Sequence, residues 1–489
     1  MAYTLASVPL ALRYLDKAEF GLWGLTMQMA GYVALIDFGM GGVSRILIDY
    51  KDSKDEPTYG SVIQTTVLVS LVQAVLVLAC GVALGIGLGP VVRIPEGFNR
   101  EFMVLVIGQC GLIAGGFVTR IFTFLLSAHQ RQDVLNYAQP VVFAGNFSVL
   151  WLCLASGIGV FSTLWAQLCG WALSTVIAIA WCFRLHVFPR AGCWGRPTWA
   201  RFRESFAYGR DIFLFTVGSQ LANASQMILV TRQLGLEAAA IWAVCTRSYV
   251  LVTHLIYRIF DNSCPALAEM IVRGEKDWLQ RRFHAIVVVS GSASIVAGVI
   301  FAICNQHFVR LWTNGEVSWP VINDALLAVA LVLSVIAHCH VGLVGQTKEF
   351  RSLRYISLLE GFWFVGCSVF VLRWAGIPGM LVIAIVSTLL FSFAYGTWRT
   401  AKYFGFGWNE AALNWSWPSL RLALLLVPVG CALFFAMRAL PALAQLMVGG
   451  IVTAAVGSLL FLRYGLDSGL RSELFQRLPT WLPTRLRGR

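Results

Sequence analysis

The stretch SVIQTTVLVSLVQAVLVLACGVALGIGLG, residues 61–89, decides the fold because it contains no charged side chain. About 20 consecutive apolar residues are enough to cross a hydrocarbon core about 30 Å thick. Within lipid the backbone must satisfy its own hydrogen bonds, and a helix does so locally. A second run of the same kind covers residues 283–302. The sequence therefore predicts an all-α integral membrane protein.

The composition supports this class over the whole chain. Of 489 residues, 58% are hydrophobic and only 12% are charged, whereas soluble domains carry roughly 25% charged residues. The net charge of +13 does not indicate nucleic-acid binding, because most Lys and Arg residues fall in loops expected on one side of the membrane. That bias is typical of cytoplasmic loops, and it places both termini in the cytoplasm.

Hydropathy predicts about fourteen spans, the first of them partial. The spans are 3–12, 20–44, 61–89, 101–128, 134–156, 159–183, 210–231, 238–260, 283–309, 321–346, 353–375, 377–398, 420–439 and 443–462.

An internal repeat organises these spans. Arg13 matches Arg232 and Gly157 matches Gly376, each pair separated by 219 residues. Their order and near-constant offset indicate that a six-helix unit is duplicated. Because six is even, both copies enter from the same side, as parallel repeats related by an axis along the membrane normal. Further pairs at this offset are Leu15 with Leu234 and Trp23 with Trp242.

Two six-helix lobes are the layout of an alternating-access carrier, and the alternative is a duplicated bundle without a pathway.

The second lobe has a full first helix, whereas only twelve residues precede Arg13, about 18 Å of helix. We expect the chain to begin inside this abbreviated first helix. The predicted divisions are the first lobe 1–183, a basic linker 184–209, the second lobe 210–399, two extra helices 400–465 and a basic cytoplasmic tail 466–489.

The linker lies either on the cytoplasmic membrane surface, where its arginines attract anionic lipid, or in solvent.

A short N-terminal pattern resembles a known family. It consists of PLALRYL at 9–15, FGLW at 20–23 and LIDFG at 35–39. The pattern is similar to the polysaccharide transporter, O-antigen flippase-like, branch of the multidrug/oligosaccharidyl-lipid/polysaccharide (MOP) exporter superfamily. The resemblance extends to the topology of the whole chain, including the helix pair after the two lobes. The chain differs in having Asp16 where glycine is common after Arg-Tyr-Leu.

This resemblance implies a function and its partners. It implies translocation of undecaprenyl-pyrophosphate-linked oligosaccharide from the inner to the outer leaflet of a bacterial cytoplasmic membrane. The implied partners are the lipid-linked glycan, membrane lipids, and polysaccharide polymerase or ligase machinery.

Two arginines are predicted to lie inside spans. Arg120 is about eight residues from the inner end of its span and Arg247 about nine from the outer end of its own, which places both about 12–14 Å deep. Ionisable groups at such depth are expensive and commonly functional. Both are candidate substrate-binding residues, because a guanidinium binds a pyrophosphate through paired hydrogen bonds. The alternative is a structural ion pair or a carbonyl-capping role within one lobe.

Two acidic residues are candidates for coupling or for ion pairing. Asp37 precedes the glycine-rich segment 38–42, so a capping or turn role competes with cation coupling. Glu360 lies about two turns into its span, where it either pairs with an arginine or carries a proton.

Three amides form a further candidate group. Gln220, Asn223 and Gln226 recur at intervals of three on the first helix of the second lobe. Such a polar stripe either lines a cavity and meets sugar hydroxyls or holds helices together.

No cofactor or metal site is expected. His338 and His340 are two residues apart, so on a helix they point to nearly opposite sides. His254 is interpreted as a packing residue, and the scattered cysteines as small apolar side chains. No lysine belongs to a G-x-x-x-x-G-K-[ST] phosphate loop, so active transport would draw on an ion gradient, the membrane potential or the substrate's own gradient.

Three function classes compete. A lipid-linked oligosaccharide flippase fits the topology, the N-terminal pattern and the arginine pair. A drug or metabolite antiporter of the same fold should commit carboxylates in one lobe to cation coupling, and a cationic drug gains nothing from arginines in the cleft. A polytopic glycosyltransferase or polymerase generally needs a sizeable outer loop with catalytic carboxylates, and the predicted outer loops are short. We therefore expect a transporter and not an enzyme.

Overall fold

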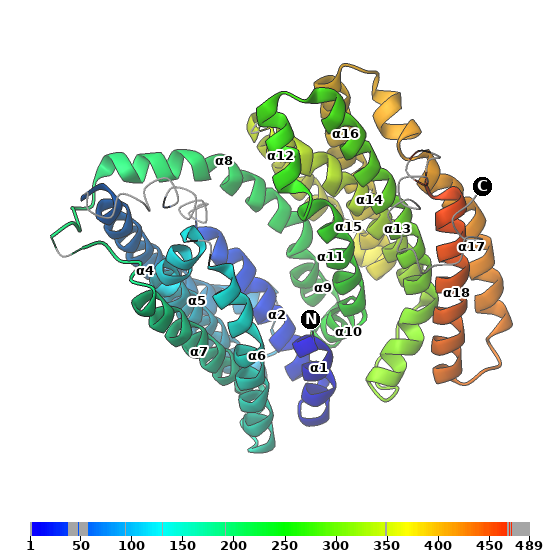
Figure 1. Ribbon diagram of the computed structural model, residues 1–489. Coiled ribbons are helices and arrows are strands. Elements are labelled where there is room, and N and C mark those ends of the chain that lie inside the picture. Colours follow the sequence, from blue (N-terminus) through cyan, green and yellow to red (C-terminus); the bar gives the residue numbers. More distant parts are fainter. Residues whose placement is uncertain are drawn as a thin grey trace. The chain divides into compact units, whose positions relative to one another are not determined.

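The computed structural model describes residues 2–37, 47, 57–92, 94–129, 131–190, 192–347, 350–466, 469 and 471. Throughout this part of the chain, helices are the regular secondary structure (Figure 1). The all-α class predicted from hydropathy is confirmed. The glycine-rich segment 38–42 and almost all of the predicted tail lie outside the described residues.

The first compact unit is Met1–Ala243. In Figure 1, α8 runs across one end of the α4 to α7 bundle of this unit. The helices are α1 (Ala2–Tyr14), α2 (Lys17–Val33) with the 3-10 turn η1 (Ala34–Asp37), α4 (Pro57–Val92), η3 (Glu96–Phe98), α5 (Asn99–Ala128), α6 (Gln132–Ala155), η4 (Gly159–Phe161), α7 (Ser162–Arg184), α8 (Trp199–Asn223), α9 (Ser225–Leu234) and most of α10 (Leu236–Cys245).

The second compact unit is Val244–Arg489. Within it α13 is central, since it packs against α11, α12, α14, α17 and α18. The elements are α11 (Arg247–Asp261), α12 (Cys264–Arg273), α13 (Lys276–Trp312), α14 (Val321–Gln346), α15 (Phe350–Thr388), the π-helix η5 (Leu389–Phe393), α16 (Ala394–Phe404), the π-helix η6 (Glu410–Asn414), α17 (Trp417–Ala436) and α18 (Ala442–Tyr464).

The boundary between the units differs from the repeat boundary. Helices α8 and α9 open the predicted second lobe, but they belong to the first unit because they pack against α2 and α4. The division into lobes, linker, extra helices and tail therefore stays a prediction.

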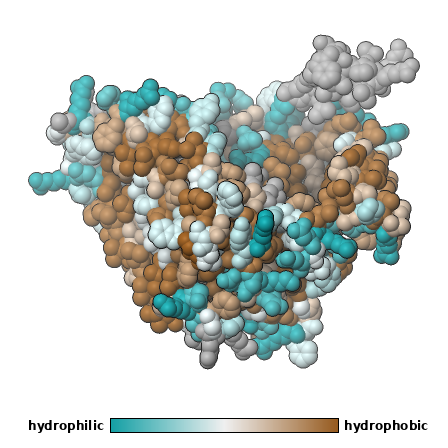
Figure 2. All heavy atoms as spheres, turned by 90° about the horizontal axis from the view of Figure 1, so that it is seen from below, coloured by the Kyte–Doolittle hydropathy of each residue, from teal (hydrophilic) through white to brown (hydrophobic). Residues whose placement is uncertain are grey.

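Eleven helical segments of the described chain are long and apolar enough to cross a membrane. One of them, Ser352–Phe404, contains two predicted spans, and Gly376 breaks its helix between them with φ 58° and ψ −152°. The shorter α1 and α2 account for the remaining two of about fourteen predicted spans. In α4, Val75 is 66% exposed and Ile86 67%, as expected for side chains that face lipid. Figure 2 shows such apolar residues over much of one face.

Two glycines that the predicted repeat pairs have similar backbone angles in the turns between helices. Gly157 (φ 76°) and Gly376 (φ 58°), which the sequence matched at one offset, both adopt the left-handed region that favours glycine. Gly235 (φ 90°) ends α9 in the same way. Its counterpart, Asp16, forms a capping box instead. The Glu19 amide donates to the Asp16 carboxylate (2.7 Å), and the Asp16 amide donates to the Glu19 carboxylate (3.0 Å). At this position the glycine of the second repeat ends a helix, whereas Asp16 caps the start of the next helix, α2.

Gly21, in the FGLW segment, allows α2 to pack directly on the start of α10. A Cβ at this position would lie 2.2 Å from the carbonyl oxygen of Leu236 and 3.5 Å from the amide nitrogen of Ala240. Because the clashing atom belongs to backbone, no side-chain rotation relieves it. Gly21 and Ala240 are themselves 219 residues apart, so matched positions of the two repeats meet at this crossing.

We expect Gly21→Ala to destabilise the protein by about 1–3 kcal/mol, the usual effect of overpacking. The matched control is Gly111→Ala in α5, where a Cβ would meet nothing within 4 Å and alanine favours the helix. Thermal unfolding of the purified protein in detergent measures both variants. Equal melting temperatures for Gly21→Ala and Gly111→Ala would contradict the close crossing.

Candidate functional site

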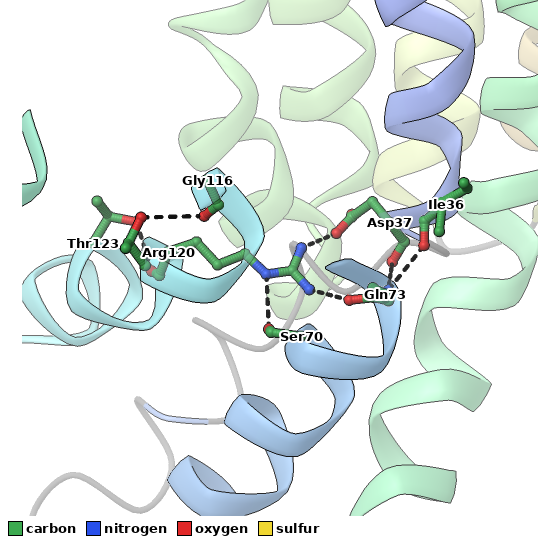
Figure 3. Close-up of polar contacts among 8 residues, drawn as sticks. Ile36, Asp37, Ser70, Gln73, Gly116, Arg120 and Thr123 are labelled. Atoms are coloured by element: carbon green, nitrogen blue, oxygen red, sulfur yellow. Dashed lines mark hydrogen bonds and ion pairs between the residues drawn. The ribbon is translucent and has the colours of Figure 1, made fainter. Parts of the chain in front are cut away.

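Arg120 of α5 lies at the centre of a polar cluster in the first unit (Figure 3). Its Nη1 forms an ion pair with the carboxylate of Asp37, and its Nη2 donates to Oε1 of Gln73. Its Nε donates to the hydroxyl of Ser70 at 3.2 Å. The Arg120 side chain is 11% exposed and that of Asp37 29%. The structure thus brings together two residues that the sequence analysis considered separately.

Gln73 of α4 ties this ion pair to the end of α2. Its Nε2 donates to the carbonyl oxygens of Ile36 (3.0 Å) and Asp37 (2.8 Å), which the short turn η1 leaves available. Gln73 is only 2% exposed, so hydrogen bonds from a buried amide support a charge pair that would be costly in lipid. The guanidinium also lies over the rings of Phe117 (4.6 Å) and Phe124 (5.6 Å).

The three candidate amides surround an interruption between α8 and α9 at Ala224. Gln220 donates to the carbonyl oxygen of Gly31 at 3.3 Å, and so binds α8 to α2. Asn223 and Gln226 donate to carbonyls of their own segment, at 2.9 Å and 3.3 Å. Of the three, Asn223 is exposed. The amides therefore do not behave alike: Gln220 holds helices together, and Asn223 remains accessible.

Tyr32 of α2 contacts residues on both sides of this interruption. Its hydroxyl donates to the carbonyl oxygen of Gln220 at 3.2 Å and hydrogen-bonds the hydroxyl of Ser225. The same carbonyl also accepts the helical hydrogen bond of the Ala224 amide at 2.7 Å, so Tyr32 is its second donor and fastens α2 to this point of the chain. Sequence reasoning missed Tyr32, since tyrosine in a predicted span carries no distinctive signal.

A second interruption, at Thr246, separates α10 from α11 in the second unit. Asn305 of α13 donates to the carbonyl oxygen of Cys245 (3.0 Å) and to a carboxylate oxygen of Asp324 (2.6 Å). Its own amide oxygen accepts from Ser248. Discontinuous helices of this kind commonly form substrate sites at the membrane midplane. Arg247 is the first residue of the helix that starts after the break.

Asp324 and Trp319 complete this second cluster, and the sequence analysis missed both as site residues. Asp324 is fully buried and accepts a hydrogen bond from the indole of Trp319 at 3.1 Å. Its position in the first turn of α14 is where an acidic side chain is ordinarily favoured by the helix dipole. The sequence alone therefore gave no reason to expect it to be buried.

Arg247 differs from Arg120 in its surroundings. Its side chain is exposed, and no hydrogen bond or ion pair joins it to another residue in the described part of the chain. It lies eleven residues into the segment Leu236–Ile271, about 16 Å along a helix. An unpaired guanidinium at that depth is strongly disfavoured against lipid. It is therefore suited to a water-filled cavity that admits an anion.

Glu360 of α15 is a buried carboxyl group, 8% exposed. The hydroxyl of Ser392 donates to its carboxylate, and Ser387 donates to its backbone carbonyl at 3.4 Å. Ser392 lies in the π-helix η5, a local irregularity often found at functional sites. Across the described ranges Glu360 has no cationic partner. Of the two roles that the sequence left open, pairing with an arginine is therefore not seen there.

The two candidate histidines of α14 contact different residues. Nδ1 of His340 hydrogen-bonds Thr400 at 2.9 Å, whereas Nε2 of His338 lies 2.9 Å from the carboxylate of Asp261. The ring of His338 stacks on Tyr257 with centroids 3.9 Å apart. Within the described residues no group of three or more His, Cys, Asp or Glu side chains could hold a metal ion.

Comparison with solved structures shows that the chain shares its fold with other proteins. An inward-facing MATE family multidrug transporter of the MOP superfamily has a TM-score of 0.68 and 14% identity, covering 82% of this chain and 94% of the other. The lipid II flippase MurJ in an inward closed conformation has a TM-score of 0.67 and 12% identity, covering 94% of this chain and 97% of the other. A search of curated proteins gave no match.

A family profile described as "polysaccharide biosynthesis protein" matches residues 4–271. The match is more than half of the chain, and it includes Asp37, Arg120 and Arg247. This agrees with the resemblance seen in the N-terminal pattern. The chain belongs to the polysaccharide biosynthesis protein family and has the fold of the MOP superfamily.

Proposed function

We propose that this protein is an alternating-access flippase that moves a lipid-linked oligosaccharide of the undecaprenyl-pyrophosphate type across a bacterial cytoplasmic membrane. Membership of a polysaccharide biosynthesis family supports a glycan substrate, and the fold shared with transporters supports translocation. A lipid-linked glycan cannot cross unaided, because its polar sugars and pyrophosphate are costly to move through hydrocarbon.

The observation that carries this proposal is the unpaired guanidinium of Arg247 deep within a membrane segment. A pyrophosphate supplies the missing anion and accepts paired hydrogen bonds from the planar guanidinium. The site is a break between two helices, whose amides at the start of α11 are also free to meet an anion. Asn223, the most accessible of the three amides, is assigned to a sugar hydroxyl together with Gln226, whereas Gln220 holds α8 to α2.

Arg120 is assigned to the same substrate, whose pyrophosphate would take the place of Asp37 beside the guanidinium. Its carboxylate partner, Asp37, occupies the position of an anion, and a pyrophosphate oxygen would replace it during transport. Removal of Asp37 from the guanidinium frees α2 from α5 at that point. Substrate binding would thereby be linked to movement of α2, whose end is held by Gln73.

Glu360 is assigned to energy coupling through a proton. We expect Glu360→Gln to make export independent of the transmembrane pH gradient and to slow it about tenfold when the gradient is imposed. The amide has the size of the acid and still accepts a hydrogen bond from Ser392, but it cannot release a proton. Initial export rates in membrane vesicles with and without a pH gradient measure the effect.

The control for this experiment is Asp324→Asn, the other buried carboxyl group of the second unit. The amide keeps an oxygen for Asn305 and Trp319, so this variant should retain the response to the gradient. An unchanged gradient response in Glu360→Gln would remove Glu360 from coupling.

Two other functions are compatible with some of these observations. A drug or metabolite antiporter of the same fold is favoured by the likeness to a MATE transporter, but Arg247 would repel the cationic drugs that such a protein exports. A polytopic glycosyltransferase or polymerase is the less favoured alternative.

Cells that lack this protein provide the test. We expect them to accumulate lipid-linked glycan that is inaccessible from the outer face of the membrane, and expression of the intact chain should restore its export. Normal surface glycan in such cells, with altered resistance to cationic drugs, would favour the antiporter.

A further inference from the structure

A cavity of about 500 Å³ lies between α4 and the first turns of α8 in the first unit. Its α4 wall is a single stripe, with members three or four residues apart along one face. Its α8 wall is an aromatic row in which Phe202 stacks on Phe206 at 5.6 Å. The lining residues are Thr65, Leu68, Val69, Val72, Gln73, Leu76, Pro197, Thr198, Trp199, Phe202 and Phe206.

The cavity is held open by the way in which the linker joins α4. A Cβ on Gly60 would lie 2.4 Å from the carbonyl of Cys193, and one on Gly195 would lie 2.3 Å from that of Pro57. The Ser61 hydroxyl donates to the carbonyl of Arg196 at 2.7 Å. The linker is thus fixed to the start of α4, and beyond this attachment α8 runs across one end of the bundle (Figure 1).

The dimensions of the cavity fit one leaflet of a bilayer. From Thr65 to Leu76 a helix rises about 16 Å, and half of a hydrocarbon core is about 15 Å. The end at Thr65 is nearest the linker, which the positive-inside pattern places in the cytoplasm. Trp199, 74% exposed at this end, is a residue type enriched at the membrane interface. The cavity is therefore suited to a hydrocarbon chain from the inner leaflet.

Two arginines are next in sequence to residues that line this cavity. Arg196 directly precedes the lining residue Pro197, and Arg203 follows Phe202 on α8. Both side chains are exposed, and neither has an ion-pair partner in the part of the chain that the structure describes. Cations at the mouth of an apolar channel complement a lipid with an anionic headgroup.

We propose that the cavity between α4 and α8 is a binding site for one anionic phospholipid of the inner leaflet. One acyl chain lies along the α4 stripe beneath Trp199, Phe202 and Phe206, and Arg196 and Arg203 bind the headgroup phosphate. The acyl chain reaches Gln73, which also hydrogen-bonds to Arg120 and to the Asp37 carbonyl. The site adjoins the Arg120–Asp37 pair through Gln73, but lipid binding is measured without glycan transport, so it is tested independently of the flippase assignment.

Native mass spectrometry of the purified protein, titrated with phosphatidylglycerol or phosphatidylcholine, tests the site. We expect one phosphatidylglycerol to bind more tightly than phosphatidylcholine. The double variant Arg196→Gln/Arg203→Gln should weaken phosphatidylglycerol binding roughly thirtyfold, because each interfacial arginine contributes about fivefold. Val72→Trp, which fills the cavity, should abolish binding of both lipids.

The matched control is Arg273→Gln/Arg281→Gln, which removes two exposed arginines from the second unit and should leave the affinity unchanged. Equal weakening by both arginine pairs would reduce the effect to general surface charge and overturn the proposal. Equal affinity for the two lipids would overturn the headgroup assignment. A polyprenyl lipid displaced by Val72→Trp would identify a different occupant and likewise refute the phospholipid site.

Discussion

Replacing Arg247 with alanine is expected to reduce glycan export about a hundredfold while leaving insertion and thermal stability unchanged. The side chain is exposed and lacks a partner in the described chain, so its removal exposes no buried polar group. A charge-assisted contact to an anion in a membrane cavity contributes about 3 kcal/mol when lost, which corresponds to roughly two powers of ten. Outer-face glycan in cells, normalised to the amount of membrane-inserted protein, measures the effect.

Two further variants sharpen this result. Arg247→Lys keeps the charge but loses the planar pair of donors, so it should restore export only in part. Arg258→Ala removes another exposed arginine of the same helix and should export normally. Full export by Arg247→Ala, or an equal defect in Arg258→Ala, would exclude a direct role for Arg247.

Replacing Arg120 with alanine should affect both stability and export. Asp37, Ser70 and Gln73 would each lose a partner, and breaking an enclosed ion pair by removing one member costs about 3 kcal/mol or more. Part of that cost is lost to solvent screening, since Asp37 is 29% exposed. We expect lower thermal stability in detergent together with loss of export. Arg120 and Arg247 should therefore be distinguishable by stability alone.

The double variant Arg120→Gln/Asp37→Asn separates structure from transport. It removes both charges and retains groups that can hydrogen-bond, so most of the lost stability should return. Export should stay low if Arg120 binds the pyrophosphate. Recovery of export along with stability would mean that the ion pair serves the fold alone.

Much of the fold was predictable because hydropathy and glycine act locally. The apolar run at 61–89 became α4, and the break at Gly376 was predicted because its partner at 157 marks the same turn in the first repeat. The role of Asp16 was harder to predict, since it does not end α1 with a left-handed turn as its counterpart Gly235 ends α9. Its capping box with Glu19 became evident only in the structure.

The clusters were less predictable because their members are distant in sequence. Arg120 and Asp37 were both candidates, but nothing local indicates that residues 83 positions apart form a pair. The helix interruptions at Ala224 and Thr246 contain neither glycine nor proline. Carbonyls beside them accept hydrogen bonds from Tyr32 and Asn305 of other helices. These long-range hydrogen bonds lie outside any local pattern.

Translocation by the purified protein in liposomes tests the central claim most directly. Vesicles would carry a pyrophosphate-linked polyprenyl oligosaccharide, and a membrane-impermeant glycosidase, which reaches only the outer leaflet, would report the fraction of glycan hydrolysed over time. We predict that this fraction rises from half toward completion with the intact protein and stays near half with Arg247→Ala. A fraction that stays near half with the intact protein, as in protein-free vesicles, would contradict the flippase assignment.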